Sequence, residues 1–422
     1  MGRTWPALAV VVAALWATGS ASASPRVQYG IKDDAWLAFG PGTLEQRVRQ
    51  LDQLGVKIVR YTLRWDEIAT RRPRYPRWSG APAYSWGSAD RVLKALHRHH
   101  IPVVLGINGA PRWANGGHTP NFAPTSARFT SDFARAAAQR YPWVRRWLIW
   151  NEPNQSRFLR PTTPEVYVQR LLNPAYTALH ARNSRNRVGG GLTAPRGKLS
   201  PVTWIRRMAA AGAKLDAYAH HPYPEDPHVE SPISGGCGHC RSITMATLGR
   251  LERATLAAWG PIPLWLTEYG YQTNPPDRVD GVSLVKQARY EDDAALRAYQ
   301  APRVDMLIHF MFRDDPSPAG WQSGFFTANG LAKPAVQAFP LPLAQVSRTG
   351  TSTVIWGQVR PHQGKRPFRL QRFVSGRWAW ITHTVQTNER GFLRRAVRAG
   401  PGAKFRLWSA LDGRFGFVLV VH

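Results

Sequence analysis

Two glutamates in this sequence stand directly after apolar runs. Glu152 follows Trp147-Leu-Ile-Trp-Asn, and Glu268 follows Pro263-Leu-Trp-Leu-Thr. A charge at the end of a buried strand is costly unless it is paired or used. Two carboxyl groups can cleave a glycosidic bond, because one protonates the leaving oxygen while the other attacks the anomeric carbon or directs water to it. The pair therefore predicts this acid–base and nucleophilic chemistry.

The segments around the glutamates belong to a regular alternation of strands and helices. Apolar, β-branched runs predict strands at residues 27–33, 57–65, 101–108, 146–151, 187–193, 215–221, 263–269 and 304–312. Amphipathic patterns predict helices at 43–54, 88–99, 126–141, 164–182, 202–211, 243–259 and 284–299. Eight strands alternating with helices predict an α/β fold, a (β/α)8 barrel. An open doubly wound sheet is disfavoured, because no glycine-rich phosphate loop follows the first strand.

A barrel would bring the two glutamates together. Glu152 ends the fourth predicted strand and Glu268 ends the seventh. These strands lie on facing sides of an eight-stranded barrel, and the sites of barrel enzymes lie at the C-terminal ends of the strands. We therefore expect the two carboxyl groups to converge across the mouth of the barrel.

The pattern changes after Pro334. From about residue 341 apolar residues alternate with period two between glycine-rich turns, which predicts a small all-β sandwich with strands at 353–358, 368–374, 378–385, 391–397, 404–409 and 415–421. The stretch from Trp378 to Phe392 resembles Ig-like modules of exported bacterial proteins. Glycan binding, wall attachment and a plain spacer packed on the barrel are all compatible with it, and the spacer is favoured.

The N-terminal segment is typical of a secretory signal peptide. A positive charge at Arg3 precedes an apolar run at residues 7–18 and an Ala21-x-Ala23 cleavage site. An uncleaved membrane anchor is the alternative. We expect a signal peptide at 1–23, a catalytic barrel at 24–340 and an Ig-like accessory domain at 341–422. The mature protein is then secreted or held at the cell surface, with no membrane span.

Cys237 and Cys240 are the two cysteines of the chain. In a cytosolic protein this spacing would indicate a redox or zinc half-site, but an exported chain favours a local disulfide. A zinc site would need further ligands, and only His239 is adjacent. We expect a structural disulfide, no metal and no cofactor.

The charge balance is strongly positive. Lysine and arginine total 56 against 26 acidic residues, a formal net charge of +30. An acidic polysaccharide as partner and an arginine-rich genome explain this equally well. Nucleic-acid binding is disfavoured, because the charge is not gathered in one run and no nucleic-acid motif is present.

The two glutamate motifs resemble those of glycoside hydrolase clan A, the retaining (β/α)8-barrel, or TIM-barrel, glycosidases. The resemblance covers roughly residues 27–335 and is greatest to family 39 and to family 5. It implies that Glu152 is the acid/base and Glu268 the nucleophile. It also implies that Asn151 contacts the 2-hydroxyl of the sugar under attack.

The resemblance extends to the surroundings of the glutamates. It implies that Arg60 on the second strand steadies the nucleophile, that His221 and Tyr223 end the sixth strand, and that Tyr223 hydrogen-bonds Glu268. Trp113, after the third strand, is expected to form an aromatic platform for a sugar. The clan often has a tryptophan at the end of the eighth strand, and here Phe312 or Trp321 would take its place.

These expectations describe a monomeric enzyme acting on a neutral or acidic poly- or oligosaccharide in an open, aromatic-lined groove. The alternatives are a non-catalytic carbohydrate-binding protein on a barrel scaffold, a transglycosylase using the same residues, and a structural surface protein. The first is disfavoured because decay of a catalytic site usually removes one carboxylate, whereas both stand here in full motifs.

Overall fold

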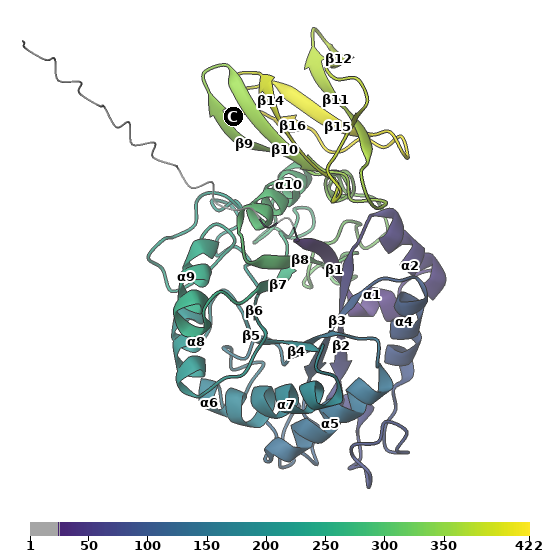
Figure 1. Ribbon diagram of the computed structural model, residues 1–422, viewed down its shortest axis with the longest axis vertical. Coiled ribbons are helices and arrows are strands. Elements are labelled where there is room, and N and C mark those ends of the chain that lie inside the picture. The colour runs from purple at the N-terminus through teal and green to yellow at the C-terminus, as the bar shows by residue number, and fades with distance from the viewer. Residues whose placement is uncertain (1–23, 25) are drawn as a thin grey trace, which may run out of the picture.

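The computed structural model describes residue 24 and residues 26–422, so the expected signal peptide lies outside the described residues. Eight parallel strands close into a barrel in sequence order, which confirms the predicted fold class (Figure 1). The strands are β1 (Gln28–Lys32), β2 (Ile58–Arg64), β3 (Val103–Asn108), β4 (Arg146–Ile149), β5 (Arg187–Thr193), β6 (Ala217–His220), β7 (Leu264–Tyr269) and β8 (Val304–Phe310).

Helices surround the barrel on its outer side (Figure 1). They are α1 (Asp34–Phe39), α2 (Leu44–Gln53), α3 (Trp65–Ile68), α4 (Gly87–Arg98), α5 (Ala127–Arg140), α6 (Pro164–Val166), the π-helical segment η1 (Tyr167–Leu172), α7 (Asn173–Arg182), α8 (Pro201–Ala210), α9 (Leu248–Trp259), α10 (Leu284–Gln300) and α11 (Ala335–Ala338). Thr43 and Gln46 form a reciprocal capping box at the start of α2. Among the described residues, no helix has both the length and the apolar character to cross a membrane.

Alternate residues of the barrel strands point inward and outward, because side chains on a strand alternate between its two faces. The inward set forms its own apolar cluster, Ile58, Val104, Leu148, Leu192, Ala217, Ala219, Trp265, Met306 and Ile308. The outward set packs against the helices in the largest core cluster of the protein. Both faces of every strand are thereby buried, which explains the nearly continuous apolar runs of the sequence.

Strand β8 ends earlier than the sequence predicted, at Phe310 instead of residue 312. The amide nitrogens of Phe312 and Arg313 donate to Oδ2 of Asp33, 3.1 and 3.2 Å away, and Oδ1 of Asp33 accepts from the amide of Trp36. The Asp33 carboxylate therefore accepts hydrogen bonds from amides that would otherwise pair with a neighbouring strand. It links the end of β8 to the start of α1.

The C-terminal region forms two antiparallel sheets, as the predicted sandwich requires. One contains β9 (Leu343–Thr349), β10 (Ser352–Gln358) and β14 (Phe392–Arg398); the other contains β11 (Pro367–Val374), β12 (Arg377–Trp380), β13 (Val385–Gln386), β15 (Lys404–Ser409) and β16 (Leu419–Val420). Strand β9 was not among the predicted strands, and the last predicted strand shortens to β16. Apolar residues of both sheets, including Ile355, Leu370 and Leu407, form a separate core.

The sandwich packs on one side of the barrel beside α10 (Figure 1). Tyr299 at the end of α10 lies 5.3 Å from Trp356 and 4.7 Å from Phe392 between ring centroids. The guanidinium of buried Arg360 lies 3.8 Å from the ring centroid of Tyr29 on β1. Apolar and cation–π contacts therefore join the two parts into one body.

Candidate active site

A cavity of about 540 Å³ lies at the C-terminal ends of the barrel strands. Glu152 and Glu268 both line it, and so do Asn151, Tyr223 and Trp321. Their positions follow from the closed barrel, since the ends of β4, β6 and β7 and the loop after β8 meet at one rim. The cavity is also lined by Lys32, Gln155, Arg157, Phe158, Arg196, Glu225, Tyr271, Gln272, Asp280 and Phe310.

The turn after β4 holds Glu152 in an uncommon backbone conformation. Trp150 has φ +75° and Glu152 has φ +39°, in the left-handed region that non-glycine residues rarely adopt. Such residues cost about 1–3 kcal/mol each and persist where the surrounding structure holds them. Here Trp150 Nε1 donates to the carbonyl of Phe158 at 2.7 Å, and buried Asn154 exchanges hydrogen bonds with the backbone of Ala194 at 2.9 and 3.2 Å.

The carboxyl group of Glu152 is held mainly through one oxygen. Oε1 lies 2.9 Å from Nδ1 of His221. Arg60 Nη1 lies 3.0 Å from the other ring nitrogen of His221, and the hydroxyl of Thr267 lies 3.1 Å from that nitrogen. Oε2 lies 3.1 Å from Nε2 of Gln155 and 3.8 Å from a guanidinium nitrogen of Arg157.

Glu268 stands in a more cationic environment. Arg60 Nη1 donates to its Oε1 at 2.7 Å, Lys32 Nζ lies 3.7 Å from the same oxygen, and the Tyr223 hydroxyl donates to Oε2 at 3.2 Å. Burial raises the pKa of Glu268, but the electrostatic effect of His221, Arg60 and Lys32 outweighs burial and lowers the pKa to about 2. Glu268 is therefore ionised at neutral pH.

Arg60 organises this arrangement from inside the barrel. Only 1% of the residue is exposed. Besides Glu268 it binds Oδ1 of Asn151 through Nη2 at 2.7 Å and the carbonyl of Thr267 through Nη1 at 3.1 Å. Since Oδ1 of Asn151 is an acceptor for Arg60, the amide NH₂ of Asn151 is left to face the cavity.

The potential ligand atoms of Glu152, His221 and Glu268 all lie within 4.8 Å of one another. A divalent cation here would have to displace contacts with Arg60 and would meet the charge of Lys32, so the surroundings favour proton chemistry over a metal. Cys237, His239 and Cys240 form a second close group. Their two sulfurs are bonded to each other at 2.02 Å and so are not available as thiolates.

Aromatic rings form part of the cavity wall. Trp321 is 37% exposed, and its ring centroid lies 5.0 Å from that of Tyr223 and 5.5 Å from that of Phe310. Phe312, the other expected substitute for a strand-eight tryptophan, is buried and stacks on Trp36 at 3.7 Å. Trp321 and Phe310 thus occupy the region where the resemblance implied an aromatic floor.

The structure does not bring Trp113 to this cavity. Trp113 Nε1 donates to the carbonyl of Ala69 at 2.6 Å, and the ring packs edge-on against Trp65 and Phe129 at 6.1 and 5.4 Å. It lines a different cavity of about 410 Å³ near Tyr84. Trp113 follows β3, but its ring packs against Trp65 of α3 and Phe129 of α5 and does not face the cavity that holds the glutamates.

Sequence reasoning missed Lys32, Gln155, Arg157 and Arg196, which also line the cavity. Lys32 is the last residue of β1, so the rule that placed the glutamates would have placed it too. Gln155 and Arg157 lie three and five residues after Glu152. Arg196 lies in the loop after β5, and no local pattern distinguishes it from the many other arginines of the chain.

Comparison with solved structures shows what this fold is similar to. A family 39 glycoside hydrolase from the gut symbiont Bacteroides cellulosilyticus WH2 aligns with 16% identity and a TM-score of 0.60, over 90% of this chain and 80% of that one. A glucosidase from Croceicoccus marinus aligns with 12% identity and a TM-score of 0.60, over 91% and 98% of the two chains.

The β-glucuronidase 2 of Bacteroides uniformis, covalently bound to cyclophellitol-6-carboxylate aziridine, aligns with 12% identity and a TM-score of 0.51, over 94% of this chain and 46% of that one. No protein-family model and no curated protein sequence matches the chain. At these identities the likeness shows a shared fold. It confirms the predicted (β/α)8 barrel at the level of architecture.

Proposed function

We propose that this protein is a retaining glycosidase that cleaves O-glycosidic bonds of a poly- or oligosaccharide, with Glu152 as acid/base and Glu268 as nucleophile. One observation carries the proposal: the strand ends of β4 and β7 bring two buried carboxyl groups within 4.8 Å, together with His221. Retaining glycosidases hold the pair about 5–5.5 Å apart, and inverting enzymes about 6.5–9.5 Å apart to admit a water.

The different surroundings of the two carboxyl groups support the division of roles. Glu268, ionised beside Arg60, attacks the anomeric carbon and forms a glycosyl ester as the bond to the leaving oxygen breaks. Glu152 gives its proton to that oxygen. Because His221 holds Oε1, the proton transfer uses Oε2, the oxygen facing Gln155 and Arg157. Glu152 then takes a proton from water, which hydrolyses the ester with net retention.

The neighbouring groups would act on the same transition state. The amide NH₂ of Asn151 is placed to donate to the 2-hydroxyl of the attacked sugar, a contact that strengthens as oxocarbenium character develops. Trp321 and Phe310 offer faces for the apolar side of a sugar ring. Lys32, Arg157 and Arg196 bring positive charge to the cavity, which favours a sugar that carries a carboxylate.

The solved structures support a sugar substrate of this kind. The family 39 hydrolase and the glucosidase are glycosidases by name, and the glucuronidase is recorded with a carboxylated cyclitol bound covalently. A covalent adduct on a shared fold supports a covalent intermediate here. We further propose that the protein acts outside the cell as a monomer, after removal of residues 1–23 at the Ala21-x-Ala23 site.

The test is removal of the nucleophile. A panel of neutral and uronic-acid aryl glycosides and polysaccharides identifies a cleaved substrate, and Glu268→Ala is expected to lose roughly 10⁴-fold or more in kcat. Added azide should restore turnover and give a glycosyl azide of inverted configuration, because azide occupies the place of the missing carboxylate. Glu152→Ala with azide should instead give the retained configuration.

Glu165→Gln is the matched control, since Glu165 lies on the surface in an ion pair with Arg207. Near wild-type turnover by Glu268→Ala would overturn the assignment. Transfer of the sugar to a second sugar, with no free reducing end released, would identify a transglycosylase that uses the same residues.

A further inference from the structure

The sheet of the C-terminal sandwich that contains β11, β12 and β15 has an outer face rich in aromatic and basic side chains. Phe368 and Leu370 on β11 belong to the sandwich core, so Arg369, Gln371 and Phe373 point outward. Register then assigns the neighbours: Trp380 pairs with Gln371, Trp378 with Phe373, Arg406 with Gln371 and Trp408 with Arg369. Paired residues share a face of the sheet.

Cation–π contacts place the arginines of this face over the aromatic rings. The guanidinium of Arg406 lies 4.3 Å from the ring centroid of Trp378 and 3.9 Å from that of Phe415. The guanidinium of Arg369 lies 3.8 Å from the ring centroid of Trp380. We call Arg369, Trp378, Trp380, Arg406, Trp408 and Phe415 the aromatic–arginine face.

The hydrogen bonds of these two arginines leave the outer donors of each guanidinium available. Arg406 donates from Nε to Oε1 of Gln371 at 2.7 Å, and Arg369 from Nε to the carbonyl of Thr382 at 3.4 Å. A guanidinium fixed through Nε and by ring stacking presents its two Nη groups in a rigid fork, which matches the two oxygens of a carboxylate.

Carboxylates are scarce throughout this part of the chain. Residues 341–422, all of them described, include fourteen lysines and arginines and only two acids, Glu389 and Asp412. Glu389 lies 3.4 Å from Lys365, and Asp412 is bonded to Arg414. The positive charge of the aromatic–arginine face is therefore not neutralised by an acidic partner on the same face.

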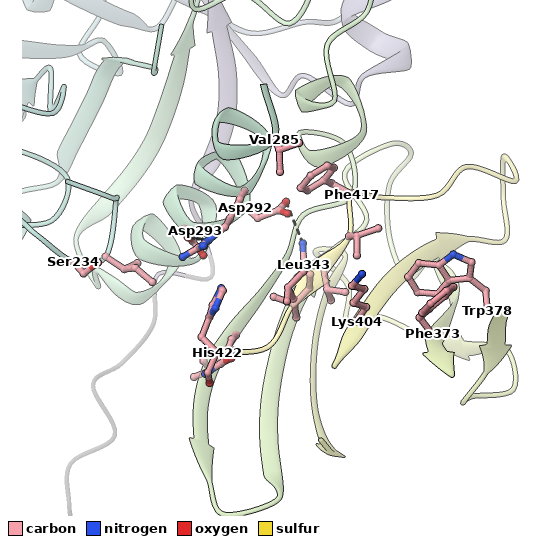
Figure 2. Close-up of a pocket in the computed structure, with 17 residues that line it drawn as sticks. Ser234, Val285, Asp292, Asp293, Leu343, Phe373, Trp378, Lys404, Phe417 and His422 are labelled. Carbon is pink, nitrogen blue, oxygen red and sulfur yellow. Dashed lines mark hydrogen bonds and ion pairs between the residues drawn. The ribbon is translucent and has the colours of Figure 1, made fainter. Parts of the chain in front are cut away.

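The face continues toward a cleft between the sandwich and the barrel. Figure 2 shows Phe373 and Trp378 side by side at one end of this cleft, with Lys404 between them and α10. The cleft has a volume of about 850 Å³. The acids on its barrel side are buried: Asp292 accepts from the amide of Leu343 at 3.3 Å, and Asp293 lies 3.6 Å from Arg289.

Exposure of the large rings indicates a surface built for contact. Trp380 is 40% exposed and Phe373 is 38% exposed, although the sandwich has a separate apolar core that does not need them. A neutral sugar would contact the aromatic rings but would gain nothing from the charge of the arginines. A sugar that carries a carboxylate can use both groups, with its ring face on an indole and its carboxylate on a guanidinium.

We propose that the aromatic–arginine face is a second binding site, which takes a carboxylated polysaccharide chain. The choice of a polysaccharide over another polyanion rests on the proposed function of the barrel, whereas the choice of a carboxylated chain rests on the face itself. The site would hold the polymer on the protein while the cavity at the barrel mouth acts on it.

The test measures binding of the full protein to polygalacturonate by calorimetry, with no need for cleavage. The double variant Arg369→Ala/Arg406→Ala is expected to lose affinity about tenfold or more, because it removes two charge-assisted contacts to the carboxylates of the polymer. Trp380→Ala should lose several-fold. Binding should weaken as salt increases, because ions screen the attraction.

The matched control is Arg394→Ala/Arg395→Ala, which removes two exposed charges from β14 in the other sheet of the same domain. This control should change affinity less than twofold. Equal losses in the two double variants would overturn the proposal, because binding would then follow net charge alone. Equal binding of methyl-esterified polygalacturonate, or of single-stranded DNA, would also overturn it.

Failure of the proposed function remains distinguishable from failure of this site. In a Glu268→Ala background, the Arg369→Ala/Arg406→Ala change should still lower the affinity for polygalacturonate, because Glu268 lies in the barrel cavity and not on the sandwich. A protein that binds the polymer through this face but cleaves no glycoside would retain the second site and lose the enzymatic proposal. Thermal denaturation of each variant checks that the sandwich remains folded.

Discussion

Arginine occupies two contrasting settings in this protein. At the barrel mouth Arg60 is buried, and its Nη groups bind Glu268, Asn151 and the backbone of Thr267. On the sandwich Arg369 and Arg406 lie on aromatic rings and use Nε for their hydrogen bonds. The same side chain therefore holds an internal carboxylate in one region and presents its charge outward in the other.

The positive charge of this chain, with its net charge of +30, therefore has a different role in each of the two regions. In the barrel cavity a cation sets the ionisation of a buried acid, and its removal leaves a charge without compensation. On the sheet face a cation has no acid to neutralise, and its removal costs little to the fold. Removal of a cation in the barrel cavity should therefore lower the stability of the fold. Removal of a cation on the sheet face should lower ligand affinity and change stability little.

The largest expected effect is that of Arg60→Ala. The variant leaves buried Glu268 without its closest partner, so the free energy of unfolding should fall by about 3–5 kcal/mol. Arg406→Ala should lose only about 0.5–1 kcal/mol, the usual size of an exposed cation–π contact. Urea denaturation at pH 7 measures both. Similar losses in the two variants would break the comparison.

A smaller effect is expected for Lys32→Met, on the acidic side of the pH profile of kcat/KM. The pKa of Glu268 is lowered from 4.5 to about 2. Its ionised form is then present well below pH 4.5, and the stability it contributes is lost only as the pH falls from about 4.5 toward 2. Lys32→Met removes a cation 3.7 Å from Oε1, so the acid limb of kcat/KM should move to higher pH by up to about one unit.

The control for this shift is Lys94→Met, which removes a lysine paired with Asp90 on the outer surface of the barrel. It should leave the pH profile where it was. An acid limb that stays in place in Lys32→Met would show that Lys32 does not influence Glu268, whatever its effect on substrate affinity.

The smallest expected effect is that of Tyr223→Phe. It removes a hydroxyl that donates to Oε2 of Glu268 at 3.2 Å, and kcat/KM should fall about fivefold, or ~1 kcal/mol, with the protein still folded. Tyr29→Phe removes a buried hydroxyl that donates to the carbonyl of Ala295 at 2.8 Å, far from the cavity. That variant should lose stability but keep kcat/KM, and the reverse pattern would contradict the role of Tyr223.

Much of the barrel was predictable because its signals are local. Each strand is an apolar run that ends at a helix or loop signal, and the eight runs recur in the order in which the strands pair. The capping box at Thr43 is likewise a short-range feature. Strand β9 was harder to predict, because Gln345, Val346 and Ser347 lie at a break in its pairing with β10.

The direction of a side chain at the rim was less predictable. Trp113 follows β3 as expected, yet its indole donates to Ala69 and packs against Trp65. The sequence contains an aromatic residue in the right loop, but a loop residue can turn either inward or outward. Lys32 shows the reverse case, because it lines the cavity from the end of β1, where the strand-end rule applies but no family motif marks the residue.

His220 and His221 are adjacent in the sequence but have different surroundings in the fold. His220 lies between Thr193 and the carbonyl of Ile243, and burial lowers its pKa to about 3. His221, one residue later, lies between Glu152, Arg60 and Thr267. The family resemblance named His221 and not His220, and the packing of neighbouring strands brings His221 to the two glutamates.

The sequence by itself determined that two carboxyl groups stand at the ends of the fourth and seventh strands of an eight-stranded barrel, because strand periodicity and apolar runs are local properties. The tertiary structure decided that His221 lies between the two glutamates, that Lys32 lies beside Glu268, and that arginines and tryptophans of three strands share one face of the sandwich. Those contacts join residues far apart in the chain. They exist only after barrel closure and strand register bring the residues together.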